Sequence, residues 1–564
     1  MIFFDFEVFC HDWLVVLANA NTQTFQTIMN NSDKLRRYYE KNKDQIWIGY
    51  NSRSYDQYIL KGLLLDFDPY QISKFIIADG RKGWEYSSAF KKIPLNVFDI
   101  MTTMHGLKQL EGFMGNDIRE TNVSFKTERK LTEAELKEVE TYCRHDVEQT
   151  MEVFMNRIDE FESQLSLLNS FKLPLSFIHK TKPQLASIIL GATRCSYSDE
   201  FKITVPDTMR LSKYRYIADW YNEPVNRDYN KSLKTIVAGI PHIFAWGGLH
   251  GAVNNYRGEG LYLNIDVASY YPALMIEYNF LSRSVADTDK YRQIRDDRIR
   301  LKKEKNLLQQ PYKIVLNSTY GAMKDKYNAL YDPRQANNVC VGGQLLLLDL
   351  IEKLEPFCQI IQSNTDGVIV KLDSVDVDAI KAICGEWERR TRMVLEFETF
   401  TRIYQKDVNN YIILRDDNTY KAKGAYVKKL DFLDNDLPIV NKALVNYFTQ
   451  GLPLDETINN CTNLMEFQKI VKVSNKYMYA AHGSKILNER VLRVFASRSK
   501  RDQGVFKYKS LERTEKIANT PPRCFIENGS VNNVPLPLKL DIHWYIEVAR
   551  KRLNDFLPGG DGCV

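Results

Sequence analysis

The chain has 564 residues, of which 77 are Lys or Arg and 71 are Asp or Glu, so its formal net charge is +6. Hydrophobic residues make up 44% of the chain and charged residues 26%, which is ordinary for globular proteins and excludes a disordered chain, collagen or a coiled-coil rod. At roughly 100–200 residues a domain, the length predicts several domains. The longest apolar runs, such as residues 345–348, are far shorter than the ~20 residues of a membrane span, so no membrane partner is expected.

Cysteine usage and the first residues predict a cytoplasmic protein. The nine cysteines are scattered singly, without a CxxC pair, and this pattern favours neither a disulfide framework nor a zinc module. Acidic residues at positions 5 and 7 stand where a secretory signal would carry basic ones.

The first predicted strand, residues 2–8, alternates between apolar and acidic side chains. Phe4, Phe6 and Val8 share one face, and Asp5 and Glu7 share the other. Two neighbouring carboxylates on a buried strand repel each other unless a cation joins them. The pattern therefore predicts a metal site against this strand.

More acidic residues follow in the expected order. Residues 47–50 predict a second strand, followed by a loop with Asp56, and residues 132–156 predict a helix on which Tyr142 and Asp146 share one face. Four carboxylates and one phenol suit two Mg²⁺ or Mn²⁺ ions bridged by a phosphate. Such an ion pair activates water and stabilises a leaving 3′ oxygen.

These three motifs resemble those of the DnaQ-like 3′–5′ proofreading exonucleases, which have an RNase H-like fold. The resemblance implies that Asp5, Glu7, Asp56 and Asp146 are catalytic metal ligands and that Tyr142 orients the attacking water. It also implies that Asn51 and Tyr55 contact the primer strand.

A second group of motifs lies between residues 240 and 430. The segment 246–251, with three glycines in six residues, predicts a turn between strands. Residues 261–266 predict a strand ending in Asp266, and residues 311–321 predict a helix with Gly321 near a bend. Residues 360–370 predict a hairpin whose polar turn holds Asp366.

The order DxxSxYP, KxxxNSxYG and TDG resembles motifs A, B and C of family B DNA polymerases. The resemblance implies that Asp266, Asp366 and the backbone carbonyl of Val267 hold two catalytic Mg²⁺ or Mn²⁺ ions on the palm. It implies nucleotide contacts for six residues, with Tyr271 as the steric gate against a 2′-hydroxyl: Tyr271, Arg298, Lys302, Lys313, Asn317 and Tyr320.

Other segments match the family in part. Gly247 and Gly248 resemble the glycine pair that links exonuclease and polymerase domains, and Tyr411, Lys421 and Lys423 resemble primer-contacting residues. Motif C departs from the usual Asp-Thr-Asp, because Asn364 replaces the first acid. Asn364 would make the site less acidic, but the retained Asp is the family's metal ligand.

Basic residues gather in two places. On a predicted fingers helix, four cations fall within about 80° of arc, which indicates an anionic ligand, since no acid on that face could pair with them: Arg295, Arg298, Lys302 and Lys305. From 469 to 516 there are 13 Lys and Arg against 4 Asp and Glu. Four rings are interleaved there, a composition typical of nucleic-acid binding: Tyr477, Tyr479, Phe506 and Tyr508.

The expected architecture is α/β and multidomain, with an RNase H-like exonuclease domain and a right-hand polymerase. The predicted boundaries are 1–165 for the exonuclease, 166–255 for a connecting region, 256–283 and 327–430 for the palm, 284–326 for the fingers, and 431–564 for the thumb and a C-terminal tail.

The function that the resemblance implies is DNA-directed DNA synthesis with 3′–5′ proofreading, in the host cytoplasm if a phage encodes the chain. Expected partners are primer-template DNA, dNTPs, single-stranded DNA at the exonuclease site, and a primase, helicase or single-strand-binding protein. The short intervals between motifs favour a nucleic-acid primer. Three alternatives stay open: a 3′–5′ exonuclease with a weakened polymerase site, a protein-primed variant, and a non-catalytic DNA-binding module.

Overall fold

The computed structural model describes residues 1–101, 105–372, 377–424, 426–510 and 513–557, so part of the expected C-terminal tail, 558–564, lies outside the described residues. The chain divides into two units, each mixing helices with β-sheet. Unit 1 comprises Met1–His179, Leu430–Val440 and Glu456–Glu547, and unit 2 comprises Lys180–Lys429, Asn441–Asp455 and Val548–Val564. The segment expected to form a thumb therefore contributes to both units.

A five-stranded sheet forms the N-terminal part of unit 1, in the order β3-β2-β1-β4-β5. Strand β1 is antiparallel to β2 and parallel to β4, and β4 is parallel to β5. The elements are β1 (Ile2–Val8), β2 (Trp13–Asn19), β3 (Thr24–Met29), β4 (Ile46–Gly49), β5 (Asn96–Asp99), α1 (Ser32–Asn42), α2 (Asp56–Leu64), α3 (Pro69–Ile77), α4 (Leu107–Met114), α5 (Glu133–Asn156) and α6 (Ile158–Ser170).

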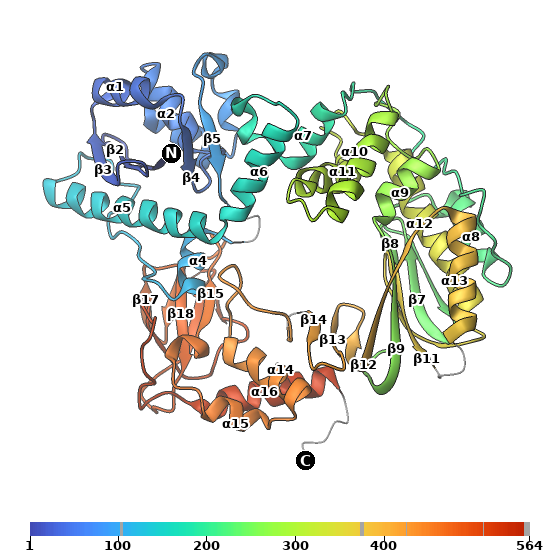
Figure 1. The fold of residues 1–564 in the computed structure, drawn as a ribbon. Coiled ribbons are helices and arrows are strands. Elements are labelled where there is room, and N and C mark those ends of the chain that lie inside the picture. The colour runs from blue at the N-terminus through green and yellow to red at the C-terminus, as the bar shows by residue number, and fades with distance from the viewer. Residues whose placement is uncertain (102–104, 373–376, 425, 511–512, 558–564) are drawn as a thin grey trace. The chain divides into compact units, whose positions relative to one another are not determined.

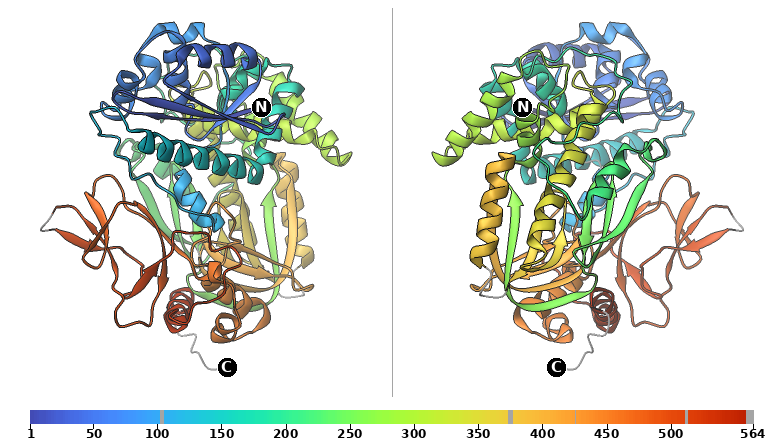
Figure 2. Two further views of the ribbon diagram at one scale, coloured as in Figure 1. Left: turned by 90° about the vertical axis from the view of Figure 1, so that its left-hand side faces the viewer. Right: turned by 90° about the vertical axis from the view of Figure 1, so that its right-hand side faces the viewer.

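The alternation predicted for β1 separates two cores. Phe4, Phe6 and Val8 pack with residues of α1, α2 and α3 on one face of the sheet. Phe3 packs on the other face with α5, which runs along the sheet in Figure 2. Thr132 begins α5 with a capping box, accepting a hydrogen bond from the N–H of Glu135. The predicted strand and helix are thus confirmed.

The C-terminal part of unit 1 contains two small sheets, in the orders β15-β18-β21 and β17-β16-β19-β20. The strands are β15 (Lys469–Lys472), β16 (Tyr479–His482), β17 (Lys485–Leu487), β18 (Val491–Ala496), β19 (Val505–Tyr508), β20 (Thr514–Lys516) and β21 (Cys524–Ile526). Three helices each contain a point in the sequence where the chain passes from one unit to the other: α14 (Pro438–Gln450), α15 (Leu454–Asn459) and α16 (Ile542–Phe556).

Arg493, on β18, links the β15-β18-β21 sheet to α4 by hydrogen bonds. Its side chain is fully buried and donates hydrogen bonds to the carbonyls of Gly112 (3.2 Å) and Asn116 (2.7 Å), at the C-terminal end of α4. Carbonyls at a helix C-terminus are unsatisfied acceptors, so a buried cation there is stabilising. Arg493, although it belongs to the basic segment, is therefore a buried structural residue and not part of a basic surface.

Unit 2 is built on a nine-stranded antiparallel sheet with the order β14-β13-β12-β9-β11-β10-β8-β7-β6. Its strands are β6 (Ser232–Val237), β7 (Ile240–Ala245), β8 (Gly248–Ala252), β9 (Tyr256–Val267), β10 (Gln359–Ser363), β11 (Gly367–Leu372), β12 (Leu395–Asp407), β13 (Asn410–Leu414) and β14 (Tyr420–Lys423). The turn predicted at 246–251 is confirmed only for residues 246 and 247, because Ala245 pairs with Gly248 and residues 248–251 belong to β8.

The helices that lie wholly in unit 2 are α7 (Lys182–Ile189), α8 (Arg215–Asn222), α9 (Tyr270–Glu277), α10 (Asp289–Lys303), α11 (Gln309–Lys324), α12 (Pro333–Leu354) and α13 (Val377–Thr391). Figure 1 shows α12 and α13 beside the sheet. Helix α12 is buried along most of its length. The bend expected at Gly321 is wrong, because α11 continues through Gly321 to Lys324. An isolated glycine is tolerated inside a helix at a cost of about 1 kcal/mol relative to alanine.

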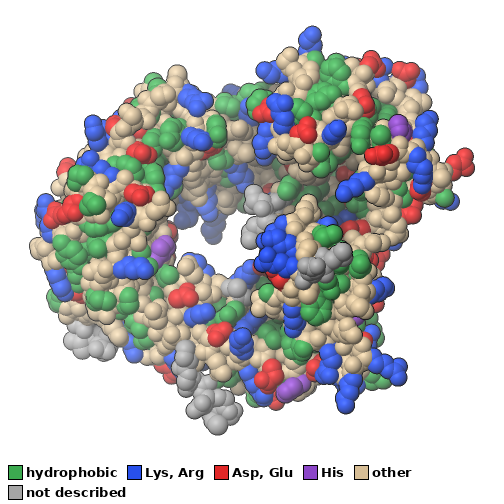
Figure 3. All heavy atoms as spheres, turned by 180° about the vertical axis from the view of Figure 1, so that it is seen from behind, with side chains coloured by type: hydrophobic (Ala, Val, Ile, Leu, Met, Phe, Trp, Pro, Cys, Tyr) green, Lys and Arg blue, Asp and Glu red, His purple; other side chains and the backbone are tan. Residues whose placement is uncertain are grey.

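On the face shown in Figure 3, Lys and Arg side chains are spread over the surface with acidic and apolar ones between them. None of the helices in the described part of the chain combines the length and the apolar character that crossing a membrane requires.

Candidate active sites

The carboxylates predicted in the N-terminal region come together on unit 1. The loop after β4 and the start of α2 bring Asp56 to β1, where its Oδ1 accepts a hydrogen bond from the N–H of Phe6 at 3.1 Å. Asp146 comes from α5, which packs on the acidic face of β1. Ligand atoms of Asp5, Glu7 and Cys143 lie within 4.8 Å of one another.

Burial and mutual repulsion dominate the electrostatics of this site. The pKa of Asp5 is raised well above its usual value, mainly by burial and then by the charges of Asp56, Glu7 and Asp146. Burial and the charges of Asp146 and Asp56 do the same for Glu7. Neighbouring carboxylates that repel one another in this way are stabilised in their ionised form by bound cations. The donor set therefore fits divalent cations with oxygen ligands.

One cation of the chain already lies in this cluster. The ammonium of Lys108, on α4, pairs with Asp146 and with Glu111, the latter at 3.1 Å. It also lies 4.6 Å from the centre of the Tyr142 ring. Burial raises the pKa of Asp146 to about 6, and Lys108 opposes that rise.

Asp99 and Lys108 are functional candidates that the motifs did not identify. Asp99 ends β5 and accepts hydrogen bonds from the backbone N–H groups of Asn51 and Arg53, both at 2.9 Å. It thereby fixes the loop that delivers Asp56. Asn51 has a φ of 63°, a left-handed conformation that Asn tolerates better than most residues. The hydroxyl of Tyr55 donates to Ser73 at 2.9 Å.

The second acidic site lies on the sheet of unit 2. Asp266, on β9, is opposite Gly367 on β11, and the N–H of Val267 donates to the carbonyl of Asp366 at 2.8 Å. Asp266 near the end of β9 therefore lies next to Asp366, which immediately precedes β11 in the turn after β10. Burial raises the pKa of Asp266, and the charge of Asp366 raises it further.

Asn364 shapes the turn that carries Asp366. Its Oδ1 accepts hydrogen bonds from the N–H groups of Asp366 (3.1 Å) and Gly367 (3.0 Å). This is the local turn chemistry typical of Asn and Asp. The unusual residue of motif C thus has a structural role in the turn.

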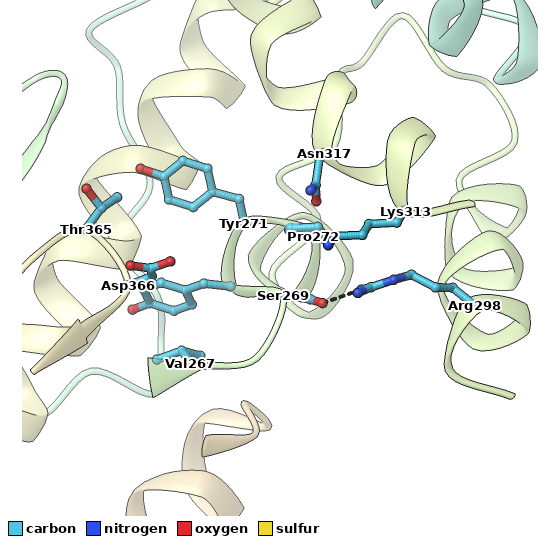
Figure 4. A pocket seen from close by; sticks show the side chains of 10 residues that line it. Val267, Ser269, Tyr271, Pro272, Arg298, Lys313, Asn317, Thr365 and Asp366 are labelled. Atoms are coloured by element: carbon cyan, nitrogen blue, oxygen red, sulfur yellow. Dashed lines mark hydrogen bonds between the residues drawn. The ribbon is translucent and has the colours of Figure 1, made fainter. Parts of the chain in front are cut away.

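A cavity of about 300 Å³ opens beside Asp366 (Figure 4). It is lined by the following residues, which come from β9, α9, α10, α11 and the β10–β11 turn: Val267, Ser269, Tyr270, Tyr271, Pro272, Arg298, Lys313, Asn317, Thr365 and Asp366. Figure 4 shows a strand-and-turn side with Asp366 and Val267 facing a helical side with Arg298, Lys313 and Asn317. An acidic wall opposite a cationic wall suits a metal-bound polyphosphate.

Arg298 is held in this cavity. Its Nη1 donates to the hydroxyl of Ser269 at 2.7 Å, and burial lowers the pKa of its guanidinium. Ser269 has a φ of 49°. A left-handed backbone conformation at a residue other than glycine costs free energy, and such conformations are common at functional sites.

Two aromatic rings lie together next to the cavity. The ring centres of Tyr271 and Tyr320 are 4.4 Å apart, and Lys324 lies 4.8 Å from the Tyr320 ring. Burial raises the pKa of both phenols, so Tyr271 is a neutral wall of the cavity.

The basic face predicted on the fingers helix is only partly present. Helix α10 ends at Lys303, and Lys305 follows with a φ of 53°. Arg295 pairs with Glu277 and with Asp296, both at 3.1 Å. The expectation that no acid could pair with this face is wrong, because the arginine side chain reaches its sequence neighbour and Glu277 arrives from α9.

Lys302 does not line the cavity; its ammonium lies 3.5 Å from the carboxylate of Glu396, with both side chains largely exposed.

The residues of unit 2 that are predicted to contact the primer lie on or next to strands of its sheet. Lys421 pairs with Glu398, and Lys423 is opposite Tyr411 on β13. Burial and the charges of Asp266 and Asp366 raise the pKa of Tyr411. A Cβ atom on Gly248 would lie 3.4 Å from the Thr365 hydroxyl, whereas Gly247 has open space.

No known protein family profile and no curated protein sequence matches the chain. Among solved structures, one similar chain is the family B DNA polymerase from the hyperthermophilic archaeon Pyrobaculum calidifontis, with a TM-score of 0.45 and 14% sequence identity. That alignment covers 100% of this chain and 78% of the archaeal one.

Proposed function

We propose that the chain is a template-directed DNA polymerase of the family B type that also carries a 3′–5′ proofreading exonuclease. The observation that carries the proposal is the cavity on unit 2, which has a volume of about 300 Å³. In it Asp366 faces Arg298, Lys313 and Asn317. Motifs A, B and C together span about 100 residues of the sequence, from Asp266 to Asp366. All three supply residues to this one cavity. That convergence is what a nucleotidyl-transfer site requires.

The residues of the cavity have distinct roles in this proposal. Lys313 and Arg298 bind the triphosphate, because cations near its oxygens stabilise the charge that develops on pyrophosphate. Tyr271, packed against Tyr320, blocks the position of a ribose 2′-hydroxyl. Asp266, Asp366 and the carbonyl of Val267 would hold two Mg²⁺ or Mn²⁺ ions, which supply activation of the primer 3′-hydroxyl and stabilisation of the leaving group.

The site on unit 1 would remove nucleotides from a single-stranded 3′ end. Asp5, Glu7, Asp56 and Asp146 would hold its Mg²⁺ or Mn²⁺ ions. Tyr142 would orient the attacking water, and Lys108 keeps the phenol and Asp146 in place. The strand order and the packing of α5 on β1 support an RNase H-like fold for this region.

One experiment tests both activities. A 5′-labelled primer on its template should lengthen with dNTPs and Mg²⁺, and shorten when dNTPs are omitted. Asp366→Asn should stop lengthening only, and Asp5→Asn with Glu7→Gln should stop shortening only. Shortening without any lengthening would reject synthesis and leave the exonuclease alternative, and absence of both would leave a DNA-binding module.

The setting we propose is phage DNA replication from a nucleic-acid primer in the host cytoplasm, with a primase, helicase or single-strand-binding protein as partners. The priming mode is supported by what fills the intervals between the motifs. Helices α9 and α10 with the start of α11 occupy more than half of the first interval, and α12 with the end of α11 and β10 occupies more than half of the second, which leaves little room for a segment that encloses a protein primer.

A further inference from the structure

We propose that the outer face of the sheet β17-β16-β19-β20 binds single-stranded nucleic acid by stacking bases on Tyr479, Phe506 and Tyr508. The inference does not depend on either carboxylate site. It concerns the basic segment 469–516, whose aromatic residues the two proposed activities leave without a role.

The strand register places three of the four rings of this segment on one face. Tyr479 is opposite Tyr508, and Ala481 is opposite Phe506. Directly opposed residues project to the same side of a sheet, and alternate residues do so as well. The rings of Tyr479 and Tyr508 are stacked, with centres 4.8 Å apart and planes at 25°. All three rings are partly exposed.

The fourth ring, Tyr477, belongs to the opposite side. It is 8% exposed and packs in the core of this region with Ala480 and Val505. Its hydroxyl donates to Glu515 at 3.0 Å, and the ammonium of Lys507 lies 4.5 Å from its ring centre. One face of the sheet is thus closed by packing, and the aromatic face is the one open to a ligand.

The strand positions of the aromatic face carry no acid. The register adds Ile486 beside Ala481 and Lys516 beside Phe506, and Thr514 lies beside Tyr508. Glu515 points to the closed face, because it is opposite Lys507. Ile486 is 57% exposed. The face therefore offers rings, an aliphatic side chain and a lysine to a partner.

These features favour nucleic acid over an apolar protein partner. The segment has 13 Lys and Arg against 4 Asp and Glu. Lys516 is exposed beside Phe506, and Lys509 and Arg513 are exposed next to the pair formed by Tyr508 and Thr514. A protein core would have to bury these cations without a partner, whereas a phosphate backbone neutralises them. Rings that stack bases beside such cations are the usual means of binding single strands.

Photo-crosslinking of the wild-type protein tests the site directly. A 20-nucleotide oligo-dT containing 5-iododeoxyuridine is bound in EDTA, which prevents metal-dependent reactions, then irradiated, and the linked peptides are identified by mass spectrometry. We expect crosslinks to Tyr479, Phe506 or Tyr508. An oligo-U with 5-iodouridine distinguishes RNA from DNA, and links to this face with either sugar support the site. Crosslinks confined to other segments would overturn it.

Affinity provides a second measurement. Tyr479→Leu and Tyr508→Leu should each weaken binding of fluorescent oligo-dT at least about fivefold in EDTA, the lower bound for one stacked base. Tyr216→Leu, which changes an exposed tyrosine of α8, is the matched control and should leave affinity unchanged. Thermal unfolding shows whether each variant is folded, and a folded double variant with wild-type affinity would contradict the proposal.

Discussion

A Cβ atom on Gly367 would lie 2.0 Å from Oδ1 of Asp266. The carboxylate of one motif thus occupies the space that the side chain of another motif would need. The glycine of the TDG motif is therefore needed for more than the turn, because only a residue without a side chain leaves room for the Asp266 carboxylate.

Gly367→Ala should therefore abolish DNA synthesis while the exonuclease stays active. The added methyl displaces the Asp266 carboxylate, and a misplacement of about 1 Å costs on the order of 100-fold in rate. The measurement is dNTP incorporation on a primed template, beside degradation of a labelled single strand. Gly385→Ala, in α13, is the control, because its nearest neighbour is a flexible arginine end at 3.4 Å. Full synthesis by Gly367→Ala would show that Asp266 is not a metal ligand.

A second prediction concerns Asn364, whose Oδ1 accepts two backbone hydrogen bonds in the motif C turn. Asn364→Asp keeps an acceptor and should retain synthesis. Asn364→Leu leaves both N–H groups without this acceptor and should lower the rate about 10-fold or more, since a lost hydrogen bond of this kind costs ~1–3 kcal/mol. Steady-state incorporation with Mg²⁺ and with Mn²⁺ compares the variants. Equal rates for Asp and Leu would show that the turn does not depend on residue 364.

The third prediction concerns Lys108. Its charge opposes the rise of the Asp146 pKa, so Lys108→Met should raise that pKa further. Because a carboxylate binds metal in its ionised form, the rising limb of the exonuclease pH profile should move to higher pH, and the rate at neutral pH should fall. Lys61→Met, which changes a half-buried lysine on α2, is the matched control. An unshifted profile for Lys108→Met would remove Lys108 from the site.

The fourth prediction is that Asp5→Asn stabilises the metal-free protein. The pKa of Asp5 is higher in the folded state than its usual ~3.9 in an unfolded chain. The folded state therefore binds this proton more tightly, and the free energy of unfolding falls as pH rises above about 4. Ionisation of Asp5 in the folded protein therefore costs free energy, so a neutral Asn at this position should raise the melting temperature at neutral pH in EDTA. Mg²⁺ should raise the melting temperature of the wild type more than that of the variant; a variant that melts lower in EDTA would contradict the repulsion.

The sequence predicted much of the fold around both sites, because their acids end or interrupt strongly apolar strands. Asp5 and Glu7 stand out in β1, as Asp266 does in β9, since an acid on a mostly apolar strand is unusual. Lys108 had no such signal: it is an ordinary lysine in a short amphipathic helix until α4 packs beside α5. Arg493 looked like one surface cation among 13, and only the carbonyls at the end of α4 explain its burial.

Helix α10, the predicted fingers helix, illustrates the limit of a helical projection. Residues 295–305 place four cations on one face of an ideal helix, but acids from other elements and the end of α10 change the environment of three of them. A projection along one element contains no information about Glu277 or Glu396. Arg298 is different, because Ser269 holds its guanidinium in the cavity.

The fifth prediction follows from that difference. Arg298→Ala should raise the KM for dNTPs about 10-fold or more, because a charged hydrogen bond to a phosphate contributes ~1.5–3 kcal/mol. Lys302→Ala should change KM less than about fivefold, since Lys302 does not line the cavity and its exposed pair with Glu396 contributes ~1 kcal/mol at most. Single-nucleotide incorporation at varied dNTP concentration measures both, and exonuclease activity should be unchanged in either variant. A larger effect of Lys302→Ala would place the triphosphate outside the cavity, against the exposed end of α10, and would require a different assignment of the nucleotide contacts.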